Sequence, residues 1–134
     1  MKYLLDTNIC IYIIKQKPIS VKQRFEVINS SDIGISIITL GELEYGAAKS
    51  QNPLRNRKTL AIFCAPFEIV GLNQEDARIF GNIRADLEKR GQPIGSYDLL
   101  IAAQALSRGL TVVTNNVKEF GRINKLRIEN WVEL

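Results

Sequence analysis

Apolar residues in this chain fall into two patterns that alternate along its length. Short apolar runs bounded by polar or turn-forming residues predict strands. These runs cover residues 2–5, 33–38, 67–70 and 110–113, with a fifth strand expected at 126–128 at an edge. Between the runs, apolar residues recur at helical spacing, as at Val21, Phe25 and Ile28. The pattern therefore predicts strands that alternate with helices.

The helix predictions rest on periodicity together with start and stop residues. Pro18 suits the first position of a helix, where its missing N–H costs nothing, and Asn73 suits an N-cap. Ser96 is expected to cap a nearly wholly apolar helix, which should therefore be central. Helices are expected over residues 9–15, from 18 onward, from 39 onward, over 54–64, from 73 to 91, and over 97–107.

This alternation predicts an α/β fold, with a mainly parallel central sheet of four to five strands and helices on both faces. At 134 residues, the chain is expected to form a single domain over 1–134. No apolar run approaches the ~20 residues of a membrane helix, and Asp6 interrupts the N-terminal apolar run too early for a secretory signal. Cys10 and Cys64 stand among aliphatic residues, which favours small buried side chains in a reducing cytoplasm.

Polar residues come after the strands at four places. Asp6-Thr7-Asn8 comes directly after the first strand, Glu42 comes soon after the second, and Asp98 lies at the start of the central helix. Thr114-Asn115-Asn116 comes after the fourth strand, with Glu119 close behind. Because the carboxyl ends of parallel strands share one edge of a sheet, we expect these side chains to meet there, where such folds bind ligands.

Each residue also has a purely structural interpretation. Asp6 suits a helix cap, and Thr39-x-x-Glu42 matches a capping box in which Glu42 would bond the Thr39 amide. Asp98 could simply stabilise a helix dipole, and Asn115-Asn116 could form a plain turn beside an exposed Glu119. These alternatives share a backbone with the functional interpretation, so the sequence leaves them open.

Carboxylates collected at one edge repel each other, and a hard divalent cation is the natural reason to gather them. We expect Asp6, Glu42 and Asp98 to hold Mg²⁺ or Mn²⁺, which would polarise a phosphodiester and lower the pKa of a bound water. The chain contains no histidine, so carboxylates and metal-bound water are its available catalytic groups.

The charge distribution is consistent with a polyanionic substrate. The formal charge is +4, from 18 basic and 14 acidic residues. With the four candidate acids set aside, 18 basic residues face 10 acidic ones, or +8. An acidic pocket in a basic surround suits a nucleic acid whose phosphate is delivered to a metal, although a slightly lysine-rich solvated surface explains the same numbers.

Four segments resemble the PIN-domain ribonucleases, specifically the VapC toxins of bacterial VapBC toxin–antitoxin pairs. They are LLDTNICIYIIK, SIITLGELEYGAAKS, PIGSYDLLIAAQALSRGLTVVTNNVKEFGRI and RIENW. The resemblance implies a PIN-like fold and a metal-dependent endoribonuclease that inhibits translation by cutting RNA, often structured RNA such as tRNA. Within this resemblance, the family's three acids fall on Asp6, Glu42 and Asp98.

The resemblance also extends to residues around these acids. The expected supporting polar residues are Thr7, Asn8, Thr114 and Asn116, and Glu119 is a candidate catalytic acid beside the other three. Asn116 stands where many relatives have Asp, with Glu119 three residues later, so the resemblance leaves open whether one or two ions act.

The resemblance further implies partners: a homodimer, a VapB-like antitoxin that silences the toxin, and DNA reached only through that antitoxin. The apolar run at residues 9–14 could help form a groove for an incoming antitoxin helix, or could be core. A non-catalytic PIN-like module that binds RNA or protein is the alternative function, and it would be favoured by loss of the cluster acids.

Overall fold

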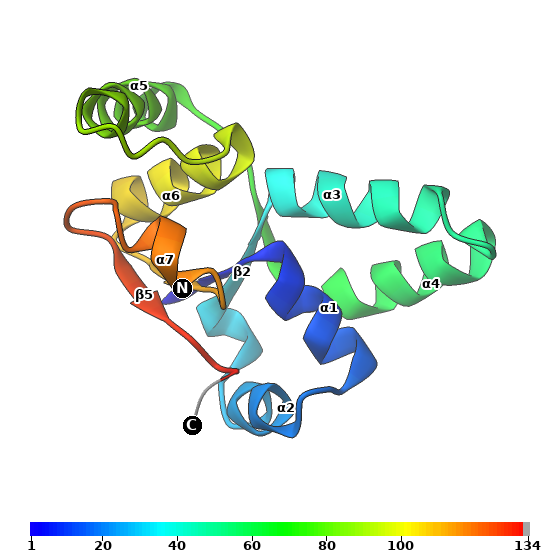
Figure 1. Cartoon of the computed structure of the whole chain (residues 1–134). Helices are drawn as coiled ribbons and strands as arrows, with labels where there is room; N and C mark the ends of the chain where they lie inside the picture. The colour runs from blue at the N-terminus through cyan, green and yellow to red at the C-terminus, as the bar shows by residue number, and fades with distance from the viewer. Residues whose placement is uncertain (133–134) are drawn as a thin grey trace.

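The computed structural model describes residues 1–132, so the predicted domain end at residue 134 lies outside the described residues. Strands and helices alternate along the described chain (Figure 1). The strands are β1 (Tyr3–Leu5), β2 (Ile33–Ser36), β3 (Glu68–Val70), β4 (Thr111–Val113) and β5 (Arg127–Glu129). The helices are α1 (Thr7–Lys15), α2 (Ile19–Glu26), the short 3-10 helix η1 (Ser30–Asp32), α3 (Ile37–Ala48), α4 (Pro53–Cys64), α5 (Gln74–Lys89), α6 (Ser96–Arg108) and α7 (Val117–Phe120).

The five strands form one sheet in the order β3-β2-β1-β4-β5, and every pairing is parallel. Central strand β1 pairs Leu5 with Ile35 of β2 and with Val113 of β4. The predicted fifth strand exists one residue later than expected and pairs with β4 at the sheet edge. The parallel α/β sheet is confirmed, and its carboxyl ends meet at one edge.

Two apolar clusters cover the two faces of the sheet. Leu4 and Leu5 are both fully buried but belong to different clusters, because successive strand residues point to opposite faces. One cluster includes residues of α1 to α4, and the other includes residues of α5, α6 and α7. Figure 1 shows the corresponding division, with α5 and α6 on one side of the strands and α1, α2 and α4 on the other.

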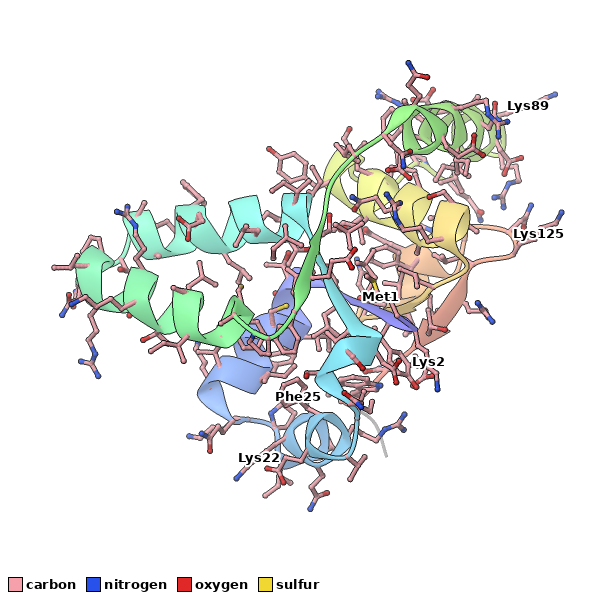
Figure 2. All side chains as sticks on the ribbon, turned by 180° about the vertical axis from the view of Figure 1, so that it is seen from behind. Met1, Lys2, Lys22, Phe25, Lys89 and Lys125 are labelled. Carbon is pink, nitrogen blue, oxygen red and sulfur yellow. The ribbon has the colours of Figure 1, made fainter. Side chains whose placement is uncertain are left out.

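Individual helices have the predicted polarity. In α2, Phe25 packs against the first cluster, while the partly exposed Lys22 pairs with Glu26 (Figure 2). Helix α6 is central as expected, with Leu99 and Ile101 among its buried residues. No helix among residues 1–132 is long and apolar enough to cross a membrane.

The main boundary error lies between β2 and α3. The strand ends at Ser36, two residues before the predicted end, and α3 begins at Ile37. The Ser36 hydroxyl accepts a hydrogen bond from the Ile38 amide and is the N-cap. Thr39 is therefore the third helical residue, and the predicted capping box between Thr39 and Glu42 is wrong.

Helix α2 begins at Ile19, so Pro18 is its N-cap rather than its first residue, and α4 begins at Pro53, one residue earlier than expected. Two further helix starts also differ from the prediction. Helix α1 begins at Thr7, two residues earlier than expected, with Asp6 as its N-cap. Gly95 occupies the N-cap position of α6, and Ser96 is its first helical residue rather than the cap. Both shifts move a predicted polar residue into the first turn of a helix without altering the sheet.

Candidate active site

Asp6 lies directly beyond β1 and is nearly fully buried. Its Oδ1 accepts a hydrogen bond from the Thr7 amide at 2.8 Å, and its Oδ2 accepts one from the Thr114 hydroxyl at 2.8 Å. Thr114 comes directly after β4, the neighbour of β1 in the sheet. Asp6 is thus both a helix cap and a fixed carboxylate at the sheet edge, so its two interpretations are compatible.

Glu42 lies in the second turn of α3, where it faces the start of α1. Its Oε1 accepts a hydrogen bond from the Thr7 hydroxyl at 2.8 Å. Thr7 therefore orients two acids at once, Asp6 through its backbone amide and Glu42 through its side chain. This link replaces the capping box as the structural partner of Glu42.

Asp98 is the third residue of α6 and is half-buried. Desolvation is the largest cause that raises the pKa of Asp98, from its ordinary value of 3.8 to about 6. The charges of Asp6, Glu119 and Glu42, and a side-chain hydrogen bond with Glu119, raise it further. Burial likewise raises the pKa of Asp6, against the lowering effect of its bonds from Thr114 and Thr7. The acids therefore lie close enough to repel one another.

The loop after β4 contributes amides to the same place. The Asn116 amide N–H donates to the Thr114 hydroxyl at 2.9 Å, and its side-chain Nδ2 donates to Glu119 Oε2 at 3.1 Å. Asn115 Nδ2 donates to the Tyr12 hydroxyl at 3.2 Å. The sequence places Asn115 at this edge, within the Thr114-Asn115-Asn116 turn, but assigns it no supporting role, and Tyr12 is not among the expected site residues.

A pocket of about 340 Å³ lies where these elements converge. Its lining consists of carboxylates and carboxamides, with no lysine or arginine among the lining residues described: Asp6, Asn8, Glu42, Asp98, Asn115 and Asn116. The hydroxyls of Thr7 and Thr114, which are not part of this lining, donate hydrogen bonds to the carboxylates of Glu42 and Asp6, respectively. Glu119 lies outside the lining and acts on the pocket through Asp98 and Asn116. The structure thus brings every predicted site residue to one edge of the sheet.

Comparison with known proteins identifies this arrangement. The PIN domain family model matches residues 3–126. The tRNA(fMet)-specific endonuclease VapC of Shigella flexneri is 47% identical over 131 residues, which span 98% of both chains.

The chain belongs to the PIN-domain family of VapC ribonucleases.

Solved structures of VapC-family complexes agree with this assignment. The DNA-bound VapBC of Salmonella typhimurium superposes with a TM-score of 0.91 at 48% identity, over 98% of each chain. VapBC2 of Rickettsia felis, bound to a promoter DNA fragment, gives a TM-score of 0.89 at 42% identity, over 98% of this chain and 99% of that one. The resemblance, the PIN fold and the ribonuclease class predicted from the sequence are confirmed.

The donor set of this VapC-family pocket fits a divalent cation. Oxygen is the ligand atom that Mg²⁺ and Mn²⁺ prefer. Burial and the charges of neighbouring acids raise the pKa of Asp98, and a bound cation would relieve that repulsion. Asp6, Glu42 and Asp98 would hold the ion. Within residues 1–132, no three acidic or cysteine side chains are already arranged around one ion position.

Asp98→Asn is expected to stabilise the metal-free protein. The pKa of Asp98 is about 6 in the folded chain and 3.8 ordinarily, so its ionisation costs folding free energy. This cost is absent below pH 3.8 and complete above pH 6. Urea unfolding in EDTA should show the variant about 2 kcal/mol more stable at pH 7.5, with the difference vanishing near pH 4.

The matched control for this prediction is Glu75→Gln, which neutralises an exposed acid in the first turn of α5. It should change stability little at either pH, because that acid lies outside the pocket. A variant Asp98→Asn that unfolds more easily than wild type at pH 7.5 would contradict the expectation and favour a structural capping role.

Proposed function

We propose that this protein is the toxin of a toxin–antitoxin pair: a metal-dependent endoribonuclease that cuts tRNA and thereby stops translation. The observation that carries the proposal is the convergence of Asp6, Glu42 and Asp98 on one pocket without basic lining residues. A cluster of this kind has little use in a protein that only binds RNA, because carboxylates repel phosphates. It is well suited to holding a cation that attracts them.

The acids and the threonines of this site have different proposed roles. Asp6, Glu42 and Asp98 would hold Mg²⁺ or Mn²⁺, while Thr7 and Thr114 keep the carboxylates of Glu42 and Asp6 aimed. When bound, the ion supplies Lewis-acid activation of the phosphodiester and a water of lowered pKa.

The amide groups complete the pocket. The side chains of Asn8, Asn115 and Asn116 offer N–H donors to the phosphate oxygens of the substrate. Glu119 fixes Asn116 by accepting its Nδ2–H, so its role is to position that amide. Substrate binding would therefore depend on these neutral donors as well as on the ion.

The proposed substrate is initiator tRNA. The Shigella flexneri relative is named a tRNA(fMet)-specific endonuclease, and its similarity spans 98% of this chain. A relative of the same name from Salmonella typhimurium is 48% identical over 131 residues. The net charge of +8 outside the four candidate acids, from 18 basic and 10 acidic residues, favours binding of a folded polyanion. We place the action in the cytoplasm, where charged tRNA is used.

The proposed partner is a VapB-type antitoxin. An apolar groove of about 380 Å³ between α1, α3 and α4 is lined by Ile11, Ile14, Leu43, Ala47 and Leu60, among others. Glu42 also lines this groove, so a helix seated there would lie next to the acidic pocket. DNA would be reached through the antitoxin, and two toxin chains would form a homodimer.

The test uses the purified chain with initiator tRNA and with elongator methionine tRNA, each in Mg²⁺, Mn²⁺ or EDTA. Mapping of the 5′ and 3′ ends should reveal one internal cut in the initiator tRNA, which EDTA abolishes and either ion restores. Equal cutting of both tRNAs would refute the substrate proposal. Cutting that persists in EDTA would refute the metal proposal.

A further inference from the structure

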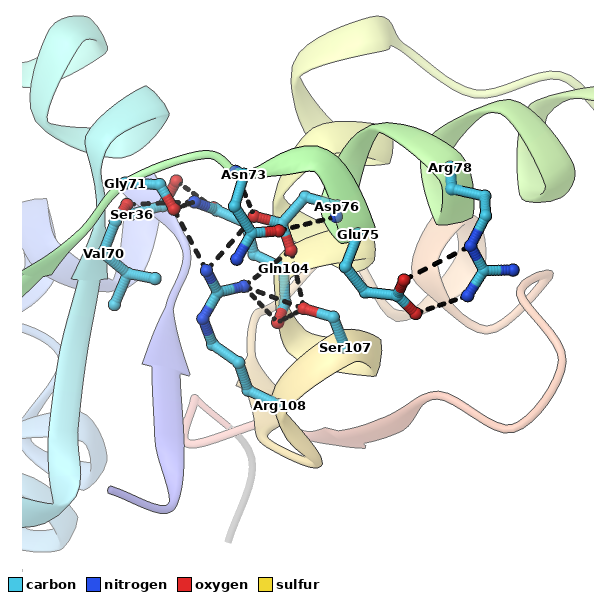
Figure 3. Close-up of polar contacts among 10 residues, drawn as sticks. All are labelled: Ser36, Val70, Gly71, Asn73, Glu75, Asp76, Arg78, Gln104, Ser107 and Arg108. Carbon is cyan, nitrogen blue, oxygen red and sulfur yellow. Dashed lines mark hydrogen bonds and ion pairs between the residues drawn. The ribbon is translucent and has the colours of Figure 1, made fainter.

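The side chain of Gln104 lies in the middle of α6 and is fully buried. Its Nε2 donates to two backbone carbonyls at the end of β3, Val70 at 2.9 Å and Gly71 at 3.1 Å. Its Oε1 accepts a hydrogen bond from the hydroxyl of Ser36, the last residue of β2 (Figure 3). One amide thus joins the carboxyl ends of two strands to the helix that carries Asp98.

The polarity of this amide is set by its partners. Carbonyl groups only accept, so Nε2 must face Val70 and Gly71, and Oε1 is left to face Ser36. The Ser36 oxygen already accepts from the Ile38 amide at 3.0 Å, so its hydrogen is directed to Gln104. All the donors of the buried pair are therefore used, and no apolar side chain of the same shape can replace either partner without leaving a buried polar group unpaired.

Ser36 is also the N-cap of α3, the helix that carries Glu42. Glu42 lies six residues after Ser36, and Asp98 lies six residues before Gln104. At 1.5 Å rise per residue, each acid lies about 9 Å along its own helix from the Ser36–Gln104 hydrogen bond. A pivot of about 6° at this bond would displace either carboxylate by about 1 Å, and a 1 Å misplacement can cost about 10²-fold in rate.

We propose that Gln104 is a positioning residue that sets the separation of Glu42 from Asp98 by locking α6 to the N-cap of α3. Its role is to fix the relative positions of two acids that would hold a divalent cation, without contact with substrate. This inference rests on the proposed ribonuclease function and adds a residue to its machinery.

The test compares Gln104→Met, which keeps the length of the side chain but removes its hydrogen bonds, with wild type. Single-turnover cleavage of initiator tRNA at saturating Mg²⁺ should slow about tenfold or more, while the KM for RNA stays within about twofold. Calorimetric titration with Mn²⁺ in the absence of RNA should show about tenfold weaker binding. Ser36→Ala should give the same pattern, and the double variant should be no worse than the worse single one, because both changes break one link.

Two controls separate positioning from general destabilisation. Ser107→Ala removes a hydroxyl of the same helix that donates to Asp76 but makes no bond to α3. Leu87→Ala removes a buried apolar side chain of α5 and lowers stability by cavity formation. Both should keep the rate constant and the Mn²⁺ affinity of wild type at a temperature where every variant is folded.

The proposal fails if Gln104→Met cleaves RNA and binds Mn²⁺ like wild type. It also fails if Leu87→Ala, with the same melting temperature as Gln104→Met, loses as much cleavage rate and as much Mn²⁺ affinity. A wild-type protein that binds Mn²⁺ but leaves RNA intact would count against the ribonuclease proposal instead, and the Mn²⁺ titration of the Gln104 variant would still decide the positioning role.

Discussion

Asp98→Asn is expected to lower RNA cleavage by ~10³-fold or more while the protein stays folded. Asparagine keeps the size of the side chain and its place in the first turn of α6, but it carries no charge. Burial, and then the charges of the neighbouring Asp6, Glu119 and Glu42, raise the pKa of Asp98. Loss of its charge therefore weakens the cluster where the cation is expected to bind. The measurement is kcat/KM on initiator tRNA at pH 8, where the wild-type carboxyl is ionised even without metal.

The control is again Glu75→Gln, which should cleave RNA like wild type because Glu75 pairs with Arg78 on the exposed face of α5. Circular dichroism and urea unfolding must show both variants folded. If Asp98→Asn cuts RNA at the wild-type rate in Mg²⁺, Asp98 is not part of the reaction, and its place at the helix start has only a structural meaning.

The fold could be predicted because each element obeys a local rule. The short apolar runs that contain the strands end at polar, glycine or proline residues, and α6 is apolar on nearly every side, as a central helix must be. The error at β2 has a physical reason. The apolar run continues through Ile37 and Ile38, and composition alone cannot separate a buried strand from the apolar first turn of the next helix.

The candidate acids could also be anticipated, because parallel strands bring the residues at their carboxyl ends to one edge of the sheet. The resemblance indicated Thr7 and Thr114 as supporting polar residues, but which acid each of them contacts could not be anticipated. Thr7 reaches Glu42 across 35 residues, and Asn115 reaches Tyr12 across 103, so both bonds depend on how helices pack.

Gln104 is a signal in the sequence that the prediction did not use, because it is the only polar residue between Leu99 and Leu106. A lone amide in an apolar helix needs buried partners, and the structure supplies them at the strand ends. The identity of those partners, Ser36 and the carbonyls of Val70 and Gly71, depends on the packing of α6 against the sheet.

A buried ion pair beside the Gln104 amide gives the second large expected effect, on stability. Asp76 is fully buried at the start of α5, and Arg108 at the end of α6 donates to both of its oxygens, at 2.7 and 3.1 Å (Figure 3). The Ser107 hydroxyl and the backbone N–H of Asn73 also donate hydrogen bonds to the Asp76 carboxylate, at 2.6 and 3.0 Å. Burial raises the pKa of Asp76, but these partners outweigh it and hold that pKa below its ordinary value.

Arg108→Met is therefore expected to destabilise the protein by about 3–5 kcal/mol at pH 7, because it leaves a buried carboxylate without its cation. Urea unfolding measures this loss. The lowered pKa of Asp76 stabilises the wild type above pH 3.8, and that contribution is lost as the pH falls through the folded value. The difference in the free energy of unfolding between Arg108→Met and wild type should therefore become smaller as the pH is lowered.

Two further variants show whether the buried charge is the cause. Arg84→Met removes a guanidinium from an exposed pair with Glu88 on α5, and should cost at most about 1 kcal/mol. Combining Arg108→Met with Asp76→Asn should recover part of the loss, since the unpaired charge is then absent. If the double variant is less stable than Arg108→Met by the full cost of Asp76→Asn alone, the two side chains act independently. The capping of α5 by Asp76, rather than its pairing with α6, would then be what stabilises this part of the fold.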